Sequence, residues 1–190
     1  MDETLIGPGW WPPTLTTDRL ILRAFAQADA PSLFRAAGNP NITRFTYWDY
    51  HQTIDTSHFF INDYVRGKYL QAEPDPFAIC LRERPDEVIG AIGAHWAERT
   101  SLCMEMGYWI AEPYWGRGLI PEAAREMLPW LFANYTLERV QAHCMAENEA
   151  SASVLAKIGM KYEGTFRSGL FHRGRFWDLQ WFAVLRGDLG

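Results

Sequence analysis

The sequence predicts a mixed α/β fold in a single domain, and three observations support it. The chain has 190 residues, a length typical of one domain. Hydrophobic residues make up 48% of it, which is enough for a sizeable core. Segments with the two-residue period of strands alternate with segments that have the longer period of helices. The predicted order is β-α-α-β-β-β-α-β-α-β-β, in a domain at 15–190 that follows a loose arm at 1–14.

The first half of the chain predicts a strand, two helices and a hairpin. In order, we expect a strand at 19–23, a helix between 29 and 38, a helix at 55–65, a polar loop at 67–76, and strands at 77–81 and 88–96 around a turn at 84–87. Asp29 suits the N-cap of the first helix, and Gly38 suits the position after its last residue. The second helix would carry Phe59, Phe60 and Tyr64 on its apolar face.

The second half predicts two more helices among four strands. In order, we expect a strand at 101–110, a long helix from about 120, a strand at 140–145, a helix at 149–158, and strands at 161–166 and 175–185 joined through 173–174. The long helix has small or apolar residues on one face, namely Ile120, Ala123, Ala124, Met127, Leu128 and Leu131. Proline removes a backbone donor, so Pro129 should kink this helix near its end.

The most informative segment is the glycine turn Gly116-Arg117-Gly118, between a strand and the long helix. Free N–H groups and the positive end of the helix dipole together make an anion site there. A Walker loop would need Gly-Lys-Ser/Thr, which is absent. A dinucleotide fingerprint would need a third glycine where Pro121 stands. The turn therefore favours a phosphate ligand of another kind.

Two blocks of sequence resemble the GNAT acyltransferases. Residues 113–118 read PYWGRG and resemble the loop with which that family holds the pyrophosphate of coenzyme A. Residues 148–167 read NEASASVLAKIGMKYEGTFR and resemble the family's second block. The match is strongest to the branch containing the ribosomal-protein N-terminal-alanine acetyltransferases. The resemblance runs from about 15 to 185, and Pro113 departs from the usual first residue of the loop.

The resemblance implies a fold, a donor and a set of binding residues. The fold is a mixed, mostly antiparallel sheet flanked by helices, whose central strands splay apart to form the coenzyme A cleft. The donor is acetyl-CoA, with no metal. The residues implied in coenzyme A binding are Tyr108, Trp109, Ile110, Trp115, Gly116, Arg117, Gly118, Leu119, Ile120, Asn148 and Ser151. The Arg117 side chain would either contact a phosphate of coenzyme A or be a solvated charge on the loop.

The resemblance also implies two catalytic side chains. Glu105 stands on the strand where the family often has a carboxylate base, and partial burial would raise its pKa. Its alternative role is a surface carboxylate. Ser151 is the candidate acid, because Leu155 stands where many family members have a tyrosine. Its alternative role is in the first turn of a helix capped by Asn148. Leu170 replaces a glutamate that the branch can use as base.

The remaining nucleophiles and histidines predict no separate chemistry. Cys144 borders the cleft, but a buried cysteine is more often a small hydrophobic residue than a nucleophile. His143 and His172 are isolated in the sequence and lack metal-ligand spacing. The substrate side is expected, from the family layout, at Phe45, Trp48, Tyr50, Phe171 and Trp177.

These residues predict an N-acetyltransferase that moves an acetyl group to a primary amine by direct attack in a ternary complex. The acceptor is either a protein N-terminal amine or a small-molecule amine, and an acyl-CoA-binding sensor without catalysis is the alternative. A net charge of -5 argues against nucleic acid as the main ligand. No apolar run is long enough for a membrane helix, and the acidic first residues are unlike a secretory signal. Three widely spaced cysteines indicate reduced thiols, as in a cytoplasmic protein. We expect the protein to be a monomer or a homodimer.

Overall fold

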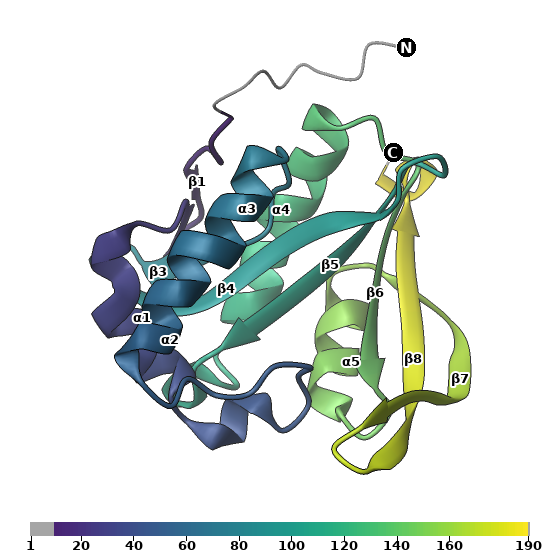
Figure 1. The fold of residues 1–190 in the computed structure, drawn as a ribbon. Coiled ribbons are helices and arrows are strands. Elements are labelled where there is room, and N and C mark those ends of the chain that lie inside the picture. Colours follow the sequence, from purple (N-terminus) through teal and green to yellow (C-terminus); the bar gives the residue numbers. More distant parts are fainter. Residues whose placement is uncertain (1–9, 190) are drawn as a thin grey trace.

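A computed structural model describes residues 10–189 as one sheet of eight strands with helices on both faces (Figure 1). The strand order is β1-β2-β3-β4-β5-β6-β8-β7. Every neighbouring pair is antiparallel except β5 and β6. The predicted mixed, mostly antiparallel sheet flanked by helices is therefore confirmed.

The strands and helices follow the predicted order, except that the two-residue first strand β1 was not predicted. The strands are β1 Leu15–Thr16, β2 Leu20–Arg23, β3 Phe77–Leu81, β4 Arg84–Glu98, β5 Cys103–Ile110, β6 Arg139–Met145, β7 Lys161–His172 and β8 Arg175–Leu185. The helices are α1 Ala30–Ala37, α2 Ile54–Phe59, α3 Arg66–Leu70, α4 Leu119–Asn134 and α5 Glu149–Lys157. Short 3₁₀ segments lie at Gln27–Asp29, Pro40–Thr43, Glu112–Tyr114 and Arg186–Leu189.

Two hydrophobic clusters hold the helices to opposite faces of the sheet. One cluster joins α4 and α5, through residues such as Met127 and Leu155, to Met104 and Met106 of β5. The other joins α1 and the α2–α3 region to β3 and β4. Side chains alternate along a strand, so neighbouring residues of β5 face different helix layers. This alternation decides which side chains of the site can meet.

The second predicted helix is longer than expected, and its buried face is different. A π-helical segment, Phe60–Val65, joins α2 to α3, so helix continues to Leu70 into the predicted loop. Of the three residues that the sequence placed on the apolar face, Phe60 packs against the cluster that includes α1, whereas Phe59 and Tyr64 are 64% and 45% exposed. The buried stripe is instead Ser57, Ile61, Val65 and Tyr69. Its spacing of four residues fits the wider turn of a π-helix.

The predicted hairpin turn at 84–87 is also wrong, because β4 already begins at Arg84. The turn lies at residues 82–83 instead. Register shifts on both sides of Cys80 insert extra residues into the pairing of β3 with β4. Such bulges are not visible in an alternating pattern, which explains the displacement. Strand β7 likewise runs on to His172, past the expected end at 166, through a register shift between Phe166 and Leu170.

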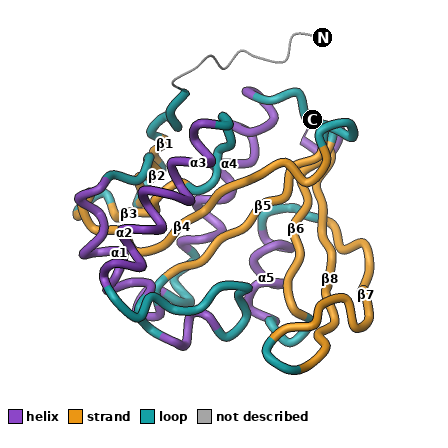
Figure 2. Tube along the Cα trace, viewed as in Figure 1, coloured by secondary structure: helices purple, strands orange, loops and turns teal. Residues whose placement is uncertain are grey.

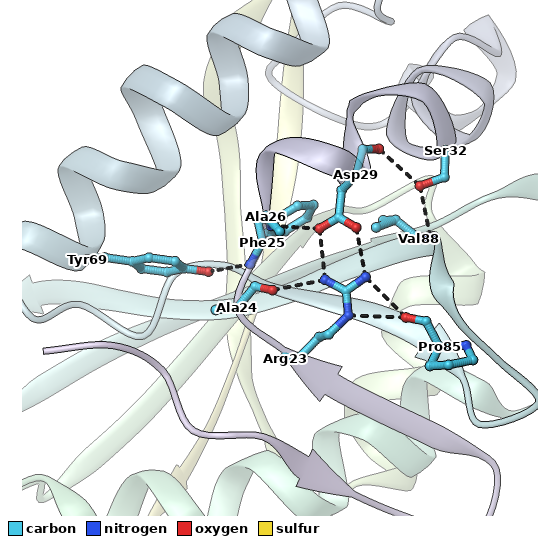
Figure 3. A network of polar contacts seen from close by, with 9 residues as sticks. All are labelled: Arg23, Ala24, Phe25, Ala26, Asp29, Ser32, Tyr69, Pro85 and Val88. Carbon is cyan, nitrogen blue, oxygen red and sulfur yellow. Dashed lines mark hydrogen bonds and ion pairs between the residues drawn. The ribbon is translucent and has the colours of Figure 1, made fainter.

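Asp29 anchors α1 by a different contact from the predicted cap (Figure 3). It occupies the N-cap position, but its carboxylate makes no cap hydrogen bond to the helix. It accepts two hydrogen bonds from the Arg23 guanidinium, at 2.8 and 2.7 Å, and one from the Ala26 N–H at 2.7 Å. Arg23 also donates to the carbonyl of Pro85. The pair therefore ties the start of α1 to β2 and β4.

Strands β5 and β6 separate shortly after they begin (Figure 2). Their parallel pairing covers only Cys103↔Arg139, Met104↔Val140 and Glu105↔Gln141. Beyond these pairs β5 remains bonded to β4 through Ile110, whereas β6 remains bonded to β8 through Met145. We call the unpaired segments 106–110 and 142–145 the V. The predicted splaying of the central strands is thus confirmed.

The described part of the predicted arm begins at Trp10. The rings of Trp10 and Trp11 lie 6.1 and 5.0 Å from the ring of Tyr69, both edge-on. The rest of the arm, residues 1–9, lies outside the described residues. Within residues 10–189, no helix is both long and apolar enough to span a bilayer.

Candidate active site

The glycine turn lies directly at the start of α4. Gly116 and Gly118 have φ angles of 71° and 73°, a left-handed conformation that favours glycine. Gly118 is the N-cap, and the first backbone bond of the helix runs from the Glu122 N–H to the Gly118 carbonyl at 3.2 Å. The N–H groups of Leu119 and Ile120 precede it and have no acceptor within the helix. Residues 115–118 are exposed, so the turn just before these donors is open to solvent, and helix starts of this kind can bind anions.

The side chains around the turn are held by neighbouring backbone. Arg19 donates from Nη1 to the Arg117 carbonyl at 3.1 Å and forms an ion pair with Glu122. The Arg117 guanidinium lies over the Tyr114 ring, 5.3 Å from its centroid. Trp115 donates from Nε1 to the Ile110 carbonyl at 2.8 Å. The turn is therefore fixed at both ends while its backbone donors remain accessible.

A second polar group lies on the α5 side of the V. The hydroxyls of Tyr108 and Ser151 are 2.9 Å apart, and Tyr108 also donates to the Ser151 carbonyl at 3.2 Å. Asn148 accepts from the Ser151 N–H at 3.2 Å and so caps α5, as the sequence indicated. Burial raises the pKa of Tyr108 far above the usual range, so its hydroxyl stays protonated. This pair can donate a hydrogen bond to a sulfur anion.

Two residues that the sequence compared with family positions are packed in apolar clusters. Leu155, on α5, is fully buried in the cluster that α4 and α5 form with the sheet. Leu170 packs against a small cluster formed by Met145, Trp177 and Leu179. Neither brings a polar atom to the V.

The face of the sheet opposite α5 carries a different polar group. Glu105 accepts a hydrogen bond from Nε2 of Gln141 at 3.0 Å. Its other oxygen lies 3.0 Å from Nδ1 of His143, at an angle away from the ideal hydrogen-bond line. The side chains of His143 and Glu105 are 15% and 18% exposed. Glu105 is therefore not a free surface carboxylate, which was its alternative role.

The pKa of Glu105 shifts in the direction opposite to the one expected from the sequence. Burial raises it, but the contacts with His143 and Gln141 and the charge of His95 outweigh burial and lower the net value. A carboxylate with a lowered pKa holds protons weakly. Glu105 is thus better suited to stabilise a neighbouring cation than to accept a proton by itself.

Tyr47 completes this group from a loop that precedes α2. Its hydroxyl forms a hydrogen bond with Nε2 of His143. Tyr47 is 52% exposed, whereas the side chains of His143 and Glu105 are mostly covered. Burial of the hydroxyl region and the nearby charge of Glu105 raise the pKa of Tyr47 to about 12. Sequence analysis missed both Tyr47 and His143, since they carry no motif and meet only in the fold.

The predicted substrate-side residues divide into two sets. Phe45 and Trp177 meet edge-on with ring centroids 6.1 Å apart. The ring centroids of Trp48 and Trp109 lie 5.5 Å apart, so the side chain of Trp109 faces the helices α1 to α3 and not α5. We call these two aromatic pairs the walls; Phe45 and Trp48 flank Tyr47 in the sequence.

Tyr50 and Phe171 lie apart from those walls. Tyr50 is 37% exposed, with no recorded aromatic or hydrogen-bond partner among the described residues. Phe171 is 63% exposed and packs on the equally exposed Phe176 near the tip of the β7–β8 hairpin. The structure therefore does not bring these two together with Glu105 or Ser151.

Arg173, at the hairpin tip, ties the hairpin to the loop that carries Tyr47. It donates to the carbonyls of Thr43 and Trp48 at 2.6 and 3.3 Å and to Asp49 at 2.9 Å. These bonds join segments more than a hundred residues apart in the chain. The loop that carries Tyr47 is therefore restrained by the hairpin tip.

The cysteine on the V is a buried thiol. Cys144 is unpaired and 6% exposed, and burial raises its pKa, which keeps the thiol protonated. His143 immediately precedes it and lies on the opposite face of β6, so it cannot act as its base. Cys144 therefore lacks what a covalent nucleophile needs.

Comparisons with known proteins give the family. The model of the acetyltransferase (GNAT) domain matches residues 19–161. Over 174 residues the chain is 28% identical to the uncharacterized N-acetyltransferase YoaA of Bacillus subtilis (strain 168), covering 92% of this chain and 97% of that one. Over 100 residues it is 27% identical to the ribosomal-protein-serine acetyltransferase of Escherichia coli (strain K12), covering 53% and 56%.

A solved structure agrees in fold over nearly the whole chain. An acetyltransferase of the GNAT family from Bacillus anthracis superposes with a TM-score of 0.79 at 26% identity, covering 91% of this chain and 98% of that one. The family match, the splayed strands and the glycine turn at the start of α4 lead to one conclusion. The chain belongs to the GNAT acetyltransferase family and is an acetyl-CoA-dependent acetyltransferase.

Proposed function

We propose that this chain transfers the acetyl group of acetyl-CoA to a primary amine by direct attack of the amine on the thioester in a ternary complex. One observation carries the proposal: two polar groups lie on opposite faces of the sheet where β5 and β6 separate. Tyr108 and Ser151 lie on the α5 face, whereas Glu105 and His143 lie on the other. A donor approaching from one face and an amine from the other would meet between them.

The glycine turn and Ser151 handle the donor in this proposal. The N–H groups from residue 116 to residue 120 bind the pyrophosphate, with the α4 dipole adding to the attraction. Unpaired strand edges of the V donate to and accept from the amides of the pantetheine arm. Ser151 and Tyr108 hydrogen-bond the sulfur as negative charge develops on it. Asn148 keeps Ser151 in place by capping α5.

The acceptor-side group removes a proton from the amine. An ammonium has no lone pair, so it must lose a proton before attack. The amine nitrogen then forms a C–N bond with the acetyl carbon, and the C–S bond breaks. Of the protons on the ammonium nitrogen, one stays in the amide, one ends on the sulfur and one leaves through the Glu105 side of the V. The walls made by Phe45, Trp48 and Trp177 orient the amine-bearing molecule.

The acceptor is a protein N-terminal amine or a small-molecule amine. The experiment measures free-thiol release from acetyl-CoA with N-terminal peptides in one set and with small amines in another, and identifies products by mass. We expect thiol release that depends on one of the two sets. Binding of acetyl-CoA without release in either set would instead identify a sensor and would refute the proposed function.

Direct attack has its own test. Initial rates at varied concentrations of both substrates should give intersecting reciprocal plots, because both substrates must be bound before acetyl transfer. Parallel plots, together with an inactive Cys144→Ala variant, would indicate an acetyl-enzyme and overturn the ternary complex. We expect Cys144→Ala to remain active, since burial keeps that thiol protonated.

A further inference from the structure

Three side chains from distant segments form a continuous chain of contacts on the acceptor side of the V. Glu105 of β5 contacts Nδ1 of His143 on β6, and Nε2 of His143 contacts the hydroxyl of Tyr47. Gln141 holds the far oxygen of Glu105, and the ring of Trp181 lies 4.6 Å from that of His143. The imidazole is therefore enclosed on its sides and contacts a hydroxyl at its outer nitrogen.

Tyr47 is the member of this chain that a ligand can reach. It is exposed over about half its surface, whereas the side chains of His143 and Glu105 are mostly covered. The residues close to Tyr47 in the sequence hold it across the V. Phe45 packs on Trp177 of β8, and Trp48 packs on Trp109 of β5, so the segment 45–48 is fixed to both halves of the splayed sheet.

We infer that Glu105, His143 and Tyr47 form a proton relay that deprotonates the acceptor amine, with the Tyr47 hydroxyl touching the amine. This inference rests on the proposed function and changes the role of Glu105. Tyr47 is the catalytic residue of the three, because it touches the substrate. His143 stores the proton, and Glu105 is a positioning residue that orients the imidazole and stabilises its charged form.

The relay balances in protons. The ammonium gives a proton to the Tyr47 oxygen while Tyr47 gives its own proton to Nε2 of His143. Tyr47 ends as a neutral phenol, and His143 becomes an imidazolium beside the ionised Glu105. The free amine keeps its lone pair for attack on the acetyl carbon. The imidazolium later returns the proton to solvent through Tyr47.

The electrostatic surroundings suit each role. The raised pKa of Tyr47 keeps the phenol protonated, so it serves as a donor to His143 and not as a stored phenolate. The lowered pKa of Glu105 keeps a negative charge beside the imidazole. The other groups that face this chain are His172, whose ring lies 6.1 Å from Tyr47, and His95, whose charge acts on Glu105.

The test is the pH dependence of kcat/KM for the amine in three variants. Tyr47→Phe and His143→Gln should each lower kcat/KM by about a hundredfold near neutral pH. In both variants kcat/KM should no longer show the fall on the acidic side of the wild-type profile. It should recover at high pH, where the amine loses its proton unaided. The double variant should be no slower than His143→Gln, because the residues act in series. Glu105→Gln should lower kcat/KM less than either of them, because the two residues that carry the proton remain in place.

Matched controls separate these effects from simple damage. Tyr162→Phe and His58→Gln make the same chemical changes on other surfaces of the molecule and should leave the profile unchanged. All variants should bind acetyl-CoA as the wild type does, because the donor lies on the other face. If Glu105→Gln removes the fall on the acidic side while Tyr47→Phe keeps the wild-type profile, Glu105 is the direct base and the relay is refuted.

A second measurement needs no acceptor. Nitrogen-15 spectra of the five histidines, with His143→Gln for assignment, report which ring nitrogen carries the proton. The relay requires neutral His143 to carry it on Nδ1, facing Glu105, so that Nε2 accepts from Tyr47. A proton on Nε2 would refute the relay even in an active enzyme. Conversely, the enzyme could acetylate no amine while His143 carries its proton on Nδ1. That result would refute the proposed function but not the chain of contacts from Glu105 through His143 to Tyr47.

Discussion

The two faces of the sheet at the V are built in contrasting ways. On the α5 face, the glycine turn opens α4, and Ser151 with its cap Asn148 opens α5. Each of these features is complete within a few consecutive residues. On the other face, Glu105, His143 and Tyr47 come from β5, β6 and the loop before α2, and they are separated by up to 96 residues. The α5 face is thus a pair of local motifs, whereas the group on the opposite face exists only once the sheet has formed.

This contrast explains why the donor is better defined than the acceptor. A helix N-terminus presents the same free donors wherever it occurs, so a glycine turn can be recognised from its sequence. A pocket assembled from distant segments depends on strand register and loop position. The spacing of residues in the sequence predicts neither of these. If this description is right, variants on the two faces should separate cleanly into donor and acceptor effects.

The largest effect expected on the donor face is that of Ser151→Ala. Loss of the hydroxyl beside Tyr108 should lower kcat by roughly ten- to a thousandfold, because the departing thiolate loses a hydrogen bond. Acetyl-CoA affinity should change little. Ser153→Ala, on an exposed position of the same helix, is the matched control. Normal turnover in Ser151→Ala would leave Ser151 as a residue of the first helical turn only.

Gly118→Asp should mainly weaken binding of the donor. The carboxylate would face the pyrophosphate from a position whose left-handed φ also disfavours a side chain. We expect affinity for acetyl-CoA to fall at least tenfold, about 1.4 kcal/mol, in calorimetry. Gly187→Asp adds the same charge at a glycine with open space around it. Unchanged affinity in a folded Gly118→Asp protein would move the phosphate site elsewhere.

Arg173→Ala should affect the acceptor side alone. It removes the bonds from the hairpin tip to Thr43, Trp48 and Asp49, so the loop that carries Tyr47 becomes less restrained. We expect KM for the amine to rise about threefold, with acetyl-CoA affinity unchanged, because positioning of the amine is weakened. Arg167→Ala, on the exposed part of β7, serves as the control. An equal loss of acetyl-CoA binding would show that the two faces are not independent.

Glu105→Gln should give the smallest effect, a change in stability that depends on pH. The pKa of Glu105 is lowered in the folded protein, so its carboxylate stabilises the fold above its unfolded value, about 4.3. That stabilisation is lost as the pH falls through the folded value. The variant should therefore unfold earlier in urea than the wild type at pH 7, and the difference should shrink as the pH falls below that unfolded value. A constant difference would mean that Glu105 acts through packing.

Errors in the sequence-based prediction follow the same division between local and distant contacts. The glycine turn, the Asn148 cap and the buried stripe of α4 lie where the sequence indicated, because each depends on neighbouring residues. The turn between β3 and β4 was misplaced because two register shifts near Cys80 depend on a partner strand. The buried face of the second helix was wrong because a π-helical segment changed its spacing.

By itself the sequence determined most of the order of the elements, the family and the glycine turn at the start of α4, since periodicity, caps and glycine turns are local properties. Only the tertiary structure decided that Glu105 lies against an imidazole, that its pKa is lowered, and that Tyr47 covers His143. The physical reason is that burial and charge at a site come from whichever segments pack there. These segments meet only when β5 and β6 pair for three residues and then separate.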